Sequence, residues 1–242
     1  MIDKHLQAQY EALTTNLATV RSTIAEAALR SGRQPDAITL VAVSKTRPLE
    51  AIQVAAQAGV RDFGENRVQE ALQKIAAFPT PRWHLIGHLQ SNKANKVVGA
   101  FQFIHSVDSL HLALALQRQA EKLQIRQSIL LQVNISGETS KEGMQPDEVP
   151  GLARQIVALP NLEVQGLMTI APRVEEPETV RPIFRALRIL RDQLQQEIPD
   201  SSWSQLSMGM TDDYCVAIEE GATIVRVGRA IFGERIDRGE LQ

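Results

Sequence analysis

Cysteine is almost absent from this chain of 242 residues, and several other residue types are scarce. Cys215 is the only cysteine, which excludes an internal disulfide framework and a cysteine-rich metal site and favours a reducing, cytoplasmic setting. Aromatic residues make up 4% of the chain, with two tyrosines and two tryptophans. The formal net charge is −2, so the overall charge does not indicate binding to a nucleic acid.

Long hydrophobic runs are missing as well. Asp3, Lys4 and His5 stand where a secretory signal would be apolar, and no segment approaches the length that spans a bilayer. We therefore expect a cytoplasmic protein that does not enter membranes. The chain is 43% hydrophobic and 22% charged, which is an ordinary globular balance in a length that suits one large core.

A long amphipathic helix is predicted at the start of the chain. Apolar side chains recur at alternating steps of four and three residues from Leu6 to Ala27, and this places them on one helical face that ends at residues 31–35. Because the repeat is short for a coiled coil, we expect residues 1–34 to pack on the body of the protein.

After Pro35, short β-like runs alternate with helical stretches. Strands are predicted over 39–44, 62–65, 83–86, 103–107, 128–134, 163–169, 205–208 and 223–227. Helices are predicted over 49–58, 67–77, 93–98, 109–122, 147–158, 179–196 and 213–219. About eight such units in roughly 200 residues favour a single α/β domain, a closed (β/α)8 TIM-like barrel over 1–242 with the additional N-terminal helix. A doubly wound open sheet has the same cadence and is the alternative.

Lys45 ends the first predicted strand, an apolar run rich in β-branched residues that Pro48 closes. In a barrel, the carboxyl ends of the strands carry the active site. An amine near apolar walls loses solvation, so we expect the pKa of Lys45 to fall and its free amine to condense with an aldehyde. Taken alone, Lys45 would be read as a solvated loop lysine; the polar motifs at the other strand ends reverse that preference and favour the chemical role.

Two consecutive loops near the end of the chain are predicted to bind an anion. The loop 206–213 offers hydroxyl groups and backbone amides, and Gly228 in the loop 225–230 lets the backbone approach closely. Barrels often hold phosphate after their seventh and eighth strands. The alternative is two ordinary glycine turns with a capping Thr211 or Asp212.

Other polar residues stand in or beside the strands. Arg226 interrupts an apolar strand; inside a barrel its cation would disfavour protonation of a nearby ring nitrogen, and outside it would pair with a helix carboxylate. His84 and His88 are spaced as zinc ligands on a helix, but Gly87 favours a strand and turn, and no glutamate or cysteine completes a set. We expect no metal and a hydrogen-bonded structural histidine. Asn66 is a candidate helix cap, a ligand contact or both.

Two further features favour structural roles. Arginines recur at helical steps between 181 and 191, which is typical of a solvated basic face opposite a core face rather than an RNA patch. Cys215 lies in a predicted helix with no histidine nearby in sequence, so we expect it in the core rather than as a nucleophile.

Together these motifs resemble those of a known family. They are AVSKT at 42–46, FGENRVQE at 63–70, HLIGHLQ at 84–90 with NK at 92–93, GLM at 166–168, SMGM at 207–210 and VRVG at 225–228. Over nearly its whole length the chain resembles the pyridoxal-phosphate homeostasis proteins, also called the proline-synthase co-transcribed or YggS-like family.

The resemblance implies a fold-type III barrel like the N-terminal domain of alanine racemase, with pyridoxal 5′-phosphate in aldimine linkage to Lys45. It also implies phosphate contacts at Ser207, Gly209 and Gly228, and Arg226 facing the pyridine nitrogen. The cofactor-binding residues expected from it are Lys45, Asn66, His84, Met168, Ser207, Met208, Gly209, Arg226, Gly228 and Arg229. Thr211 and Arg229 depart from common residues of the family, so Arg229 is either a charged phosphate contact or a side chain that faces solvent.

Carrier and enzyme remain open at this stage. A racemase of this fold class needs a second base, typically a tyrosine from a second domain, whereas Tyr10 and Tyr214 are not placed to face Lys45 and the last strand ends near Val227. We expect a monomer that serves pyridoxal-phosphate homeostasis and amino- and keto-acid balance without robust catalysis, with the cofactor and apo forms of enzymes that use it as partners. The alternatives are a weak racemase or lyase, and a Schiff-base aldolase acting on sugar phosphates.

Overall fold

Parallel strands close into a barrel in the computed structural model, which describes residues 4–138 and 141–234. The strands are β1 (Thr39–Val43), β2 (Asp62–Glu65), β3 (Arg82–Leu85), β4 (Phe103–Val107), β5 (Gln127–Gln132), β6 (Leu162–Met168), β7 (Gln205–Ser207) and β8 (Ile224–Val227). Each strand pairs with the next along the chain, and β8 returns to β1. Closure confirms the predicted (β/α)8 barrel and excludes the open sheet.

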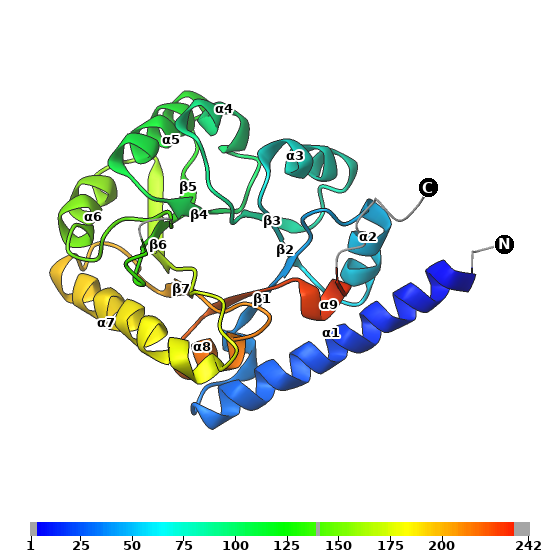
Figure 1. Ribbon diagram of the computed structural model, residues 1–242. Helices are drawn as coiled ribbons and strands as arrows, with labels where there is room; N and C mark the ends of the chain where they lie inside the picture. The colour runs from blue at the N-terminus through cyan, green and yellow to red at the C-terminus, as the bar shows by residue number, and fades with distance from the viewer. Residues whose placement is uncertain (1–3, 139–140, 235–242) are drawn as a thin grey trace.

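Helices connect the strands and surround the barrel, as Figure 1 shows. They are α1 (Lys4–Arg30), α2 (Leu49–Gln57), α3 (Val68–Ala77), α4 (Ala94–Val97), α5 (Leu110–Leu123), α6 (Val149–Val157), α7 (Arg181–Glu197), α8 (Tyr214–Glu219) and α9 (Arg229–Phe232), with 3₁₀ turns η1 (Pro35–Ala37), η2 (Ser91–Lys93) and η3 (Pro177–Val180). Every predicted strand and connecting helix occurs within two residues of its expected bounds, and the structure adds α9 and the 3₁₀ turns. Among the described residues, no helix has the length and apolarity needed to cross a bilayer.

The long helix α1 lies along the outside of the barrel, beside α2, α8 and α9 (Figure 1). The buried part of its apolar stripe runs from Leu13 to Ala27. Polar contacts supplement this packing, because Asn16 donates to the carbonyl of Ile231 at 3.3 Å and Arg21 to that of Ala58 at 2.7 Å. Helix α1 therefore packs against both the first helix of the barrel, α2, and its last helices, α8 and α9.

The pleat of the strands divides the buried side chains into two sets. Most apolar side chains point outward and pack in one large core between the strands and the helices. A small separate cluster, formed by Val41, Leu130, Met168 and Ile224 with Phe103 beside it, fills part of the barrel interior. Buried polar side chains also lie in the interior, among them His84, His105, Ser207 and Arg226.

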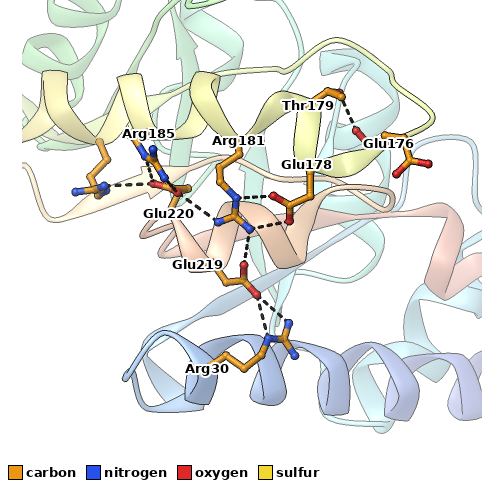
Figure 2. A network of polar contacts seen from close by, with 9 residues as sticks. Arg30, Glu176, Glu178, Thr179, Arg181, Arg185, Glu219 and Glu220 are labelled. Atoms are coloured by element: carbon orange, nitrogen blue, oxygen red, sulfur yellow. Dashed lines mark hydrogen bonds and ion pairs between the residues drawn. The ribbon is translucent and has the colours of Figure 1, made fainter.

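The arginines of α7 lie opposite its buried apolar face, as predicted, and the structure adds acidic partners to them. Arg181 contacts Glu178 and Glu219, each at 2.7 Å, and Arg185 contacts Glu220 at 2.8 Å. Figure 2 shows that the network reaches α1, where Arg30 pairs with Glu219. The sequence pattern could not reveal the pairs with Glu219 and Glu220, because these residues lie more than thirty positions further along the chain.

Glu220 is the buried centre of this network. Its side chain is 5% exposed, and hydrogen bonds from Arg185, Arg188 and Arg181 outweigh burial and lower its pKa from 4.5 to about 2. The carboxylate therefore stays charged in the folded protein and anchors α8 to α7.

Candidate functional site

A cavity of about 750 Å³ lies at the carboxyl end of the barrel. Five of the residues expected from the sequence line it: Lys45, Asn66, Arg226, Gly228 and Arg229. They come from the ends of β1, β2 and β8, so strands far apart in the sequence bring them together, as barrel geometry predicts.

The other expected residues do not line this cavity. His84, Met168 and Ser207 are buried inside the barrel beneath it, and Met208 is buried in the outer core. The hydroxyl of Ser207 contacts His105 at 2.9 Å and Arg226 at 2.6 Å.

Gly209 shapes the loop after β7 rather than lining the cavity. Its φ is +92°, and a Cβ atom there would lie 2.6 Å from the Cβ of Ala217. Only glycine combines that backbone conformation with such a close approach. The loop then presents Met210 and Thr211 to the cavity. Of the hydroxyl residues Ser207 and Thr211, Thr211 lines the cavity and Ser207 does not.

Arg226 points into the barrel, not toward an outer helix. Its guanidinium donates to the Ser207 hydroxyl at 2.6 Å and to the carbonyl of Thr169 at 2.8 Å, and the residue is 4% exposed. Burial lowers the pKa of Arg226 to about 10, against the attraction of the Asp213 carboxylate. At neutral pH it is therefore a fixed cation in the wall of the cavity.

The backbone on both sides of Lys45 is held by charged side chains. On one side, Lys74 donates to the carbonyl of Ser44 at 2.8 Å, and the Ser44 hydroxyl donates to Glu65 at 2.7 Å. On the other side, the amide of Thr46 donates to Glu70 at 2.5 Å. Thr46 has φ of +64°, an uncommon conformation for a β-branched residue that the surrounding contacts must maintain. These contacts fix where the Lys45 side chain starts.

Sequence reasoning missed the three charged residues of this support. Lys74 contacts Glu65 and Glu70, each at 2.7 Å, and its side chain is 9% exposed. Burial raises the pKa of Glu65, and the hydrogen bond from Lys74 opposes the rise. Burial also acts on Glu70, but there the hydrogen bond from Lys74 prevails and its pKa is lowered. The spacing of Glu70 and Lys74 at i, i+4 on a helix was the available signal.

Asn66 does not cap the helix that follows it. The N-cap of α3 is Arg67, and no side chain makes the capping hydrogen bond there. Instead, the Oδ1 atom of Asn66 is buried at the cavity with no hydrogen-bond partner among the described residues. Such an orphaned acceptor normally has a ligand or water as its partner.

Arg229 is engaged by acidic side chains at the mouth of the cavity. It forms a short ion pair with Asp212 and lies 3.3 Å from Glu234, and the hydrogen bond to Asp212 raises its pKa. The pair joins the loop after β7 to the start of α9, and the amide of Ala230 donates to the Thr211 hydroxyl at 3.4 Å. The two loops predicted to bind an anion are therefore tied to each other.

Two residues outside the cavity also had sequence-based expectations. His88 lies 3.5 Å from Asp108 and 3.4 Å from Glu142, so carboxylates that are distant in sequence stand beside it as possible metal ligands. Cys215 is half-buried against the outer core, and burial raises the pKa of its thiol, which disfavours the nucleophilic thiolate.

Comparison with known proteins gives consistent likenesses. Residues 9–236 match the family described as alanine racemase, N-terminal domain. The chain is 46% identical over 221 residues to a protein of Aquifex aeolicus (strain VF5) named pyridoxal phosphate homeostasis protein, covering 90% of this chain and 96% of that relative. It is 39% identical to PipY of Synechococcus elongatus, solved with PLP (pyridoxal 5′-phosphate) bound, with a TM-score of 0.81 over 91% of this chain and 100% of that one.

A more distant likeness concerns the fold alone. An alanine racemase of Clostridium difficile, solved in complex with cycloserine, superposes with a TM-score of 0.74 at 16% identity. The alignment covers 94% of this chain and 61% of the racemase.

Proposed function

Because the chain belongs to the family of pyridoxal phosphate homeostasis proteins and carries the alanine racemase N-terminal domain, we propose that it binds pyridoxal 5′-phosphate and acts in its homeostasis. Through that cofactor it influences the balance of amino and keto acids. The observation that carries the proposal is the position of Lys45, half-buried in the wall of a cavity of about 750 Å³. PipY, a relative with PLP bound, supports it.

The residues that line the cavity offer partners for the aldehyde, the ring nitrogen and the phosphate of this cofactor. The amine of Lys45 would attack the aldehyde carbon, and one water would leave as the carbon–nitrogen double bond forms. The orphaned Oδ1 atom of Asn66 would accept a hydrogen bond from the ligand. Arg226 would lie by the ring nitrogen, where its cation disfavours a proton.

We assign the phosphate group to the two joined loops. Thr211 and Gly228 line the cavity, and the Thr211 hydroxyl takes the place that the sequence had given to Ser207. Gly228 has little spare room, because a Cβ atom there would lie 3.2 Å from Val43. Arg229 would then act through its pair with Asp212, which joins the two loops, rather than as a direct contact.

These groups favour binding over turnover. When bound, pyridoxal phosphate supplies a conjugated ring that can accept electrons from a carbanion. Arg226 weakens that capacity, because a fixed cation keeps the ring nitrogen unprotonated. We therefore propose a carrier that holds and releases the cofactor, with apo forms of pyridoxal-phosphate enzymes as recipients, and that acts as a monomer in the cytoplasm.

Transfer to an apo-enzyme tests the carrier role. Protein loaded with cofactor is mixed with an apo-enzyme, and the rate of reactivation is compared with the rate of cofactor release into a trap that binds free pyridoxal phosphate. Reactivation faster than release supports direct delivery. Reactivation no faster than release removes delivery from the proposal and leaves binding.

A second assay addresses the enzymatic alternatives. Steady turnover of an amino acid that Lys45→Ala abolishes would replace the carrier by a racemase or lyase. Colourless protein that cleaves sugar phosphates would replace it by an aldolase. Light scattering on a sizing column tests the monomer.

A further inference from the structure

A continuous row of buried polar side chains crosses the interior of the barrel beneath the cavity. Arg226 contacts Ser207 at 2.6 Å, and Ser207 contacts Nδ1 of His105 at 2.9 Å. Nε2 of His105 lies 2.9 Å from Nδ1 of His84, whose Nε2 lies 2.9 Å from Asp62. Each of these five residues is at most 6% exposed. At the far end Asp62 also accepts two hydrogen bonds from Arg82, at 2.6 and 2.7 Å.

The two ends of this row impose one direction on its protons. A guanidinium only donates hydrogen bonds, so the Ser207 oxygen accepts from Arg226 and its single proton goes to Nδ1 of His105. That nitrogen is then unprotonated, and His105 donates from Nε2 to His84. His84 in turn donates from Nε2 to Asp62, an ionised carboxylate that only accepts. Both ends therefore require the same arrangement.

Any other proton arrangement leaves a buried group unsatisfied. If His105 were doubly protonated, it would donate to Ser207, whose own proton would then have no acceptor in the row. If His84 were doubly protonated, Nε2 of His105 would have to accept, and His105 would again donate to Ser207. Unpaired buried polar groups are costly. The burial of His105, which lowers its pKa well below the usual value, agrees with a neutral ring.

We propose that Ser207, His105, His84 and Asp62 form a one-way hydrogen-bond chain whose role is to position Arg226. The chain holds one guanidinium nitrogen of Arg226, and the carbonyl of Thr169 holds another. Arg226 is thereby kept at the cavity wall as a donor-only cation, although Asp62, which ends the chain, begins β2 at the opposite end of the barrel. The effect on the cofactor rests on the proposed function.

The consequence can be measured as a pH profile. A substitution that breaks the hydrogen-bond chain allows Arg226 to move away from the ring nitrogen. That nitrogen should then protonate more easily, so the pKa of the spectral transition of bound pyridoxal phosphate should rise. A change of about one pH unit is expected from the loss of one hydrogen bond to a charged group. Asp213, the carboxylate that acts on Arg226, is present in every variant below and cannot account for a difference among them.

Ser207→Ala and Ser106→Ala form a matched pair for this test. Both serines are fully buried and both make a hydrogen bond, but Ser106 bonds to the carbonyl of Gly87 and lies outside the chain. The spectral pKa should rise in Ser207→Ala and stay unchanged in Ser106→Ala. His105→Leu should raise it, whereas His105→Gln, whose amide can still accept and donate, should return it toward the wild-type value.

A separate readout needs no cofactor. Nitrogen NMR of labelled histidine in the ligand-free protein should show both His84 and His105 as neutral rings protonated at Nε2, with His105→Gln used for assignment. A proton on Nδ1 of either ring, or equal spectral titrations in Ser207→Ala and Ser106→Ala, overturns the proposal. If the wild-type protein binds no pyridoxal phosphate, the proposed function fails and the histidine spectra still decide whether the chain exists.

Discussion

Replacing Lys74 by methionine should destabilise the protein strongly, because it leaves a buried carboxylate without its cation. Lys74 and Glu65 lie 2.7 Å apart, with side chains 9% and 0% exposed. Methionine keeps much of the length of lysine but removes the charge and the donors to Glu65, Glu70 and the Ser44 carbonyl. Breaking a buried ion pair from one side costs about 3–5 kcal/mol.

Urea unfolding at pH 7 measures the change in the free energy of unfolding, with Lys122→Met as the control. Lys122 is an exposed lysine in the last turn of α5, so its replacement should change the free energy of unfolding by about 0.5 kcal/mol or less. Adding Glu65→Gln to Lys74→Met should recover about 2 kcal/mol, because glutamine still accepts from Ser44 and carries no charge.

The loss of stability in Lys74→Met should also depend on pH. Burial raises the pKa of Glu65, and losing the opposing hydrogen bond from Lys74 raises it further. A carboxyl group with a higher pKa in the folded state binds its proton more tightly there, so the folded variant gains stability as pH falls. The deficit of Lys74→Met relative to wild type should therefore narrow between pH 8 and pH 5. A deficit below about 1 kcal/mol at pH 7, or one that widens on acidification, would refute this reasoning.

Three other substitutions probe the phosphate loops and the α7 network. Thr211→Ala should weaken pyridoxal-phosphate affinity by about 1–2 kcal/mol in an absorbance titration; unchanged affinity would place the phosphate elsewhere. Gly209→Ala should cost more stability than Gly32→Ala, because both have positive φ but only Gly209 would bring a Cβ within 2.6 Å of another atom; equal losses would contradict the contact. Glu220→Gln should cost about 2 kcal/mol at pH 7, and because folding lowers the pKa of Glu220 from 4.5 to about 2, that difference should fade as pH drops through this interval; a constant difference would exclude the carboxylate as its source.

The alternation of strands and helices could be predicted from the sequence because each element has a clear hydrophobic periodicity and is bounded by turn-forming residues. Lys45 and the loops after β7 and β8 followed from the rule that barrels place their sites at the carboxyl ends of strands. The sequence does not determine which residue at the end of a strand lines the cavity. β7 spans only Gln205–Ser207, and whether Ser207 or Thr211 faces the cavity depends on where its pleat gives way to the loop.

Partners across the barrel were also beyond reach of the sequence. Ser207 meets His105 over 102 residues of chain, and Lys74 meets the Ser44 carbonyl over 30. Such pairs follow from closure and strand register, which local patterns do not contain. The same holds for the arginines of α7, whose helical spacing gave their shared face but not the carboxylates that neutralise it.

The most direct test of the central claim is the intact mass of protein that has been mixed with pyridoxal 5′-phosphate and reduced with borohydride, followed by peptide mapping. The wild-type chain should gain one phosphopyridoxyl group on Lys45, and Lys45→Ala should gain none at the site. An unmodified wild-type chain, or the same gain in Lys45→Ala as in wild type, would contradict the claim that this amine holds the cofactor.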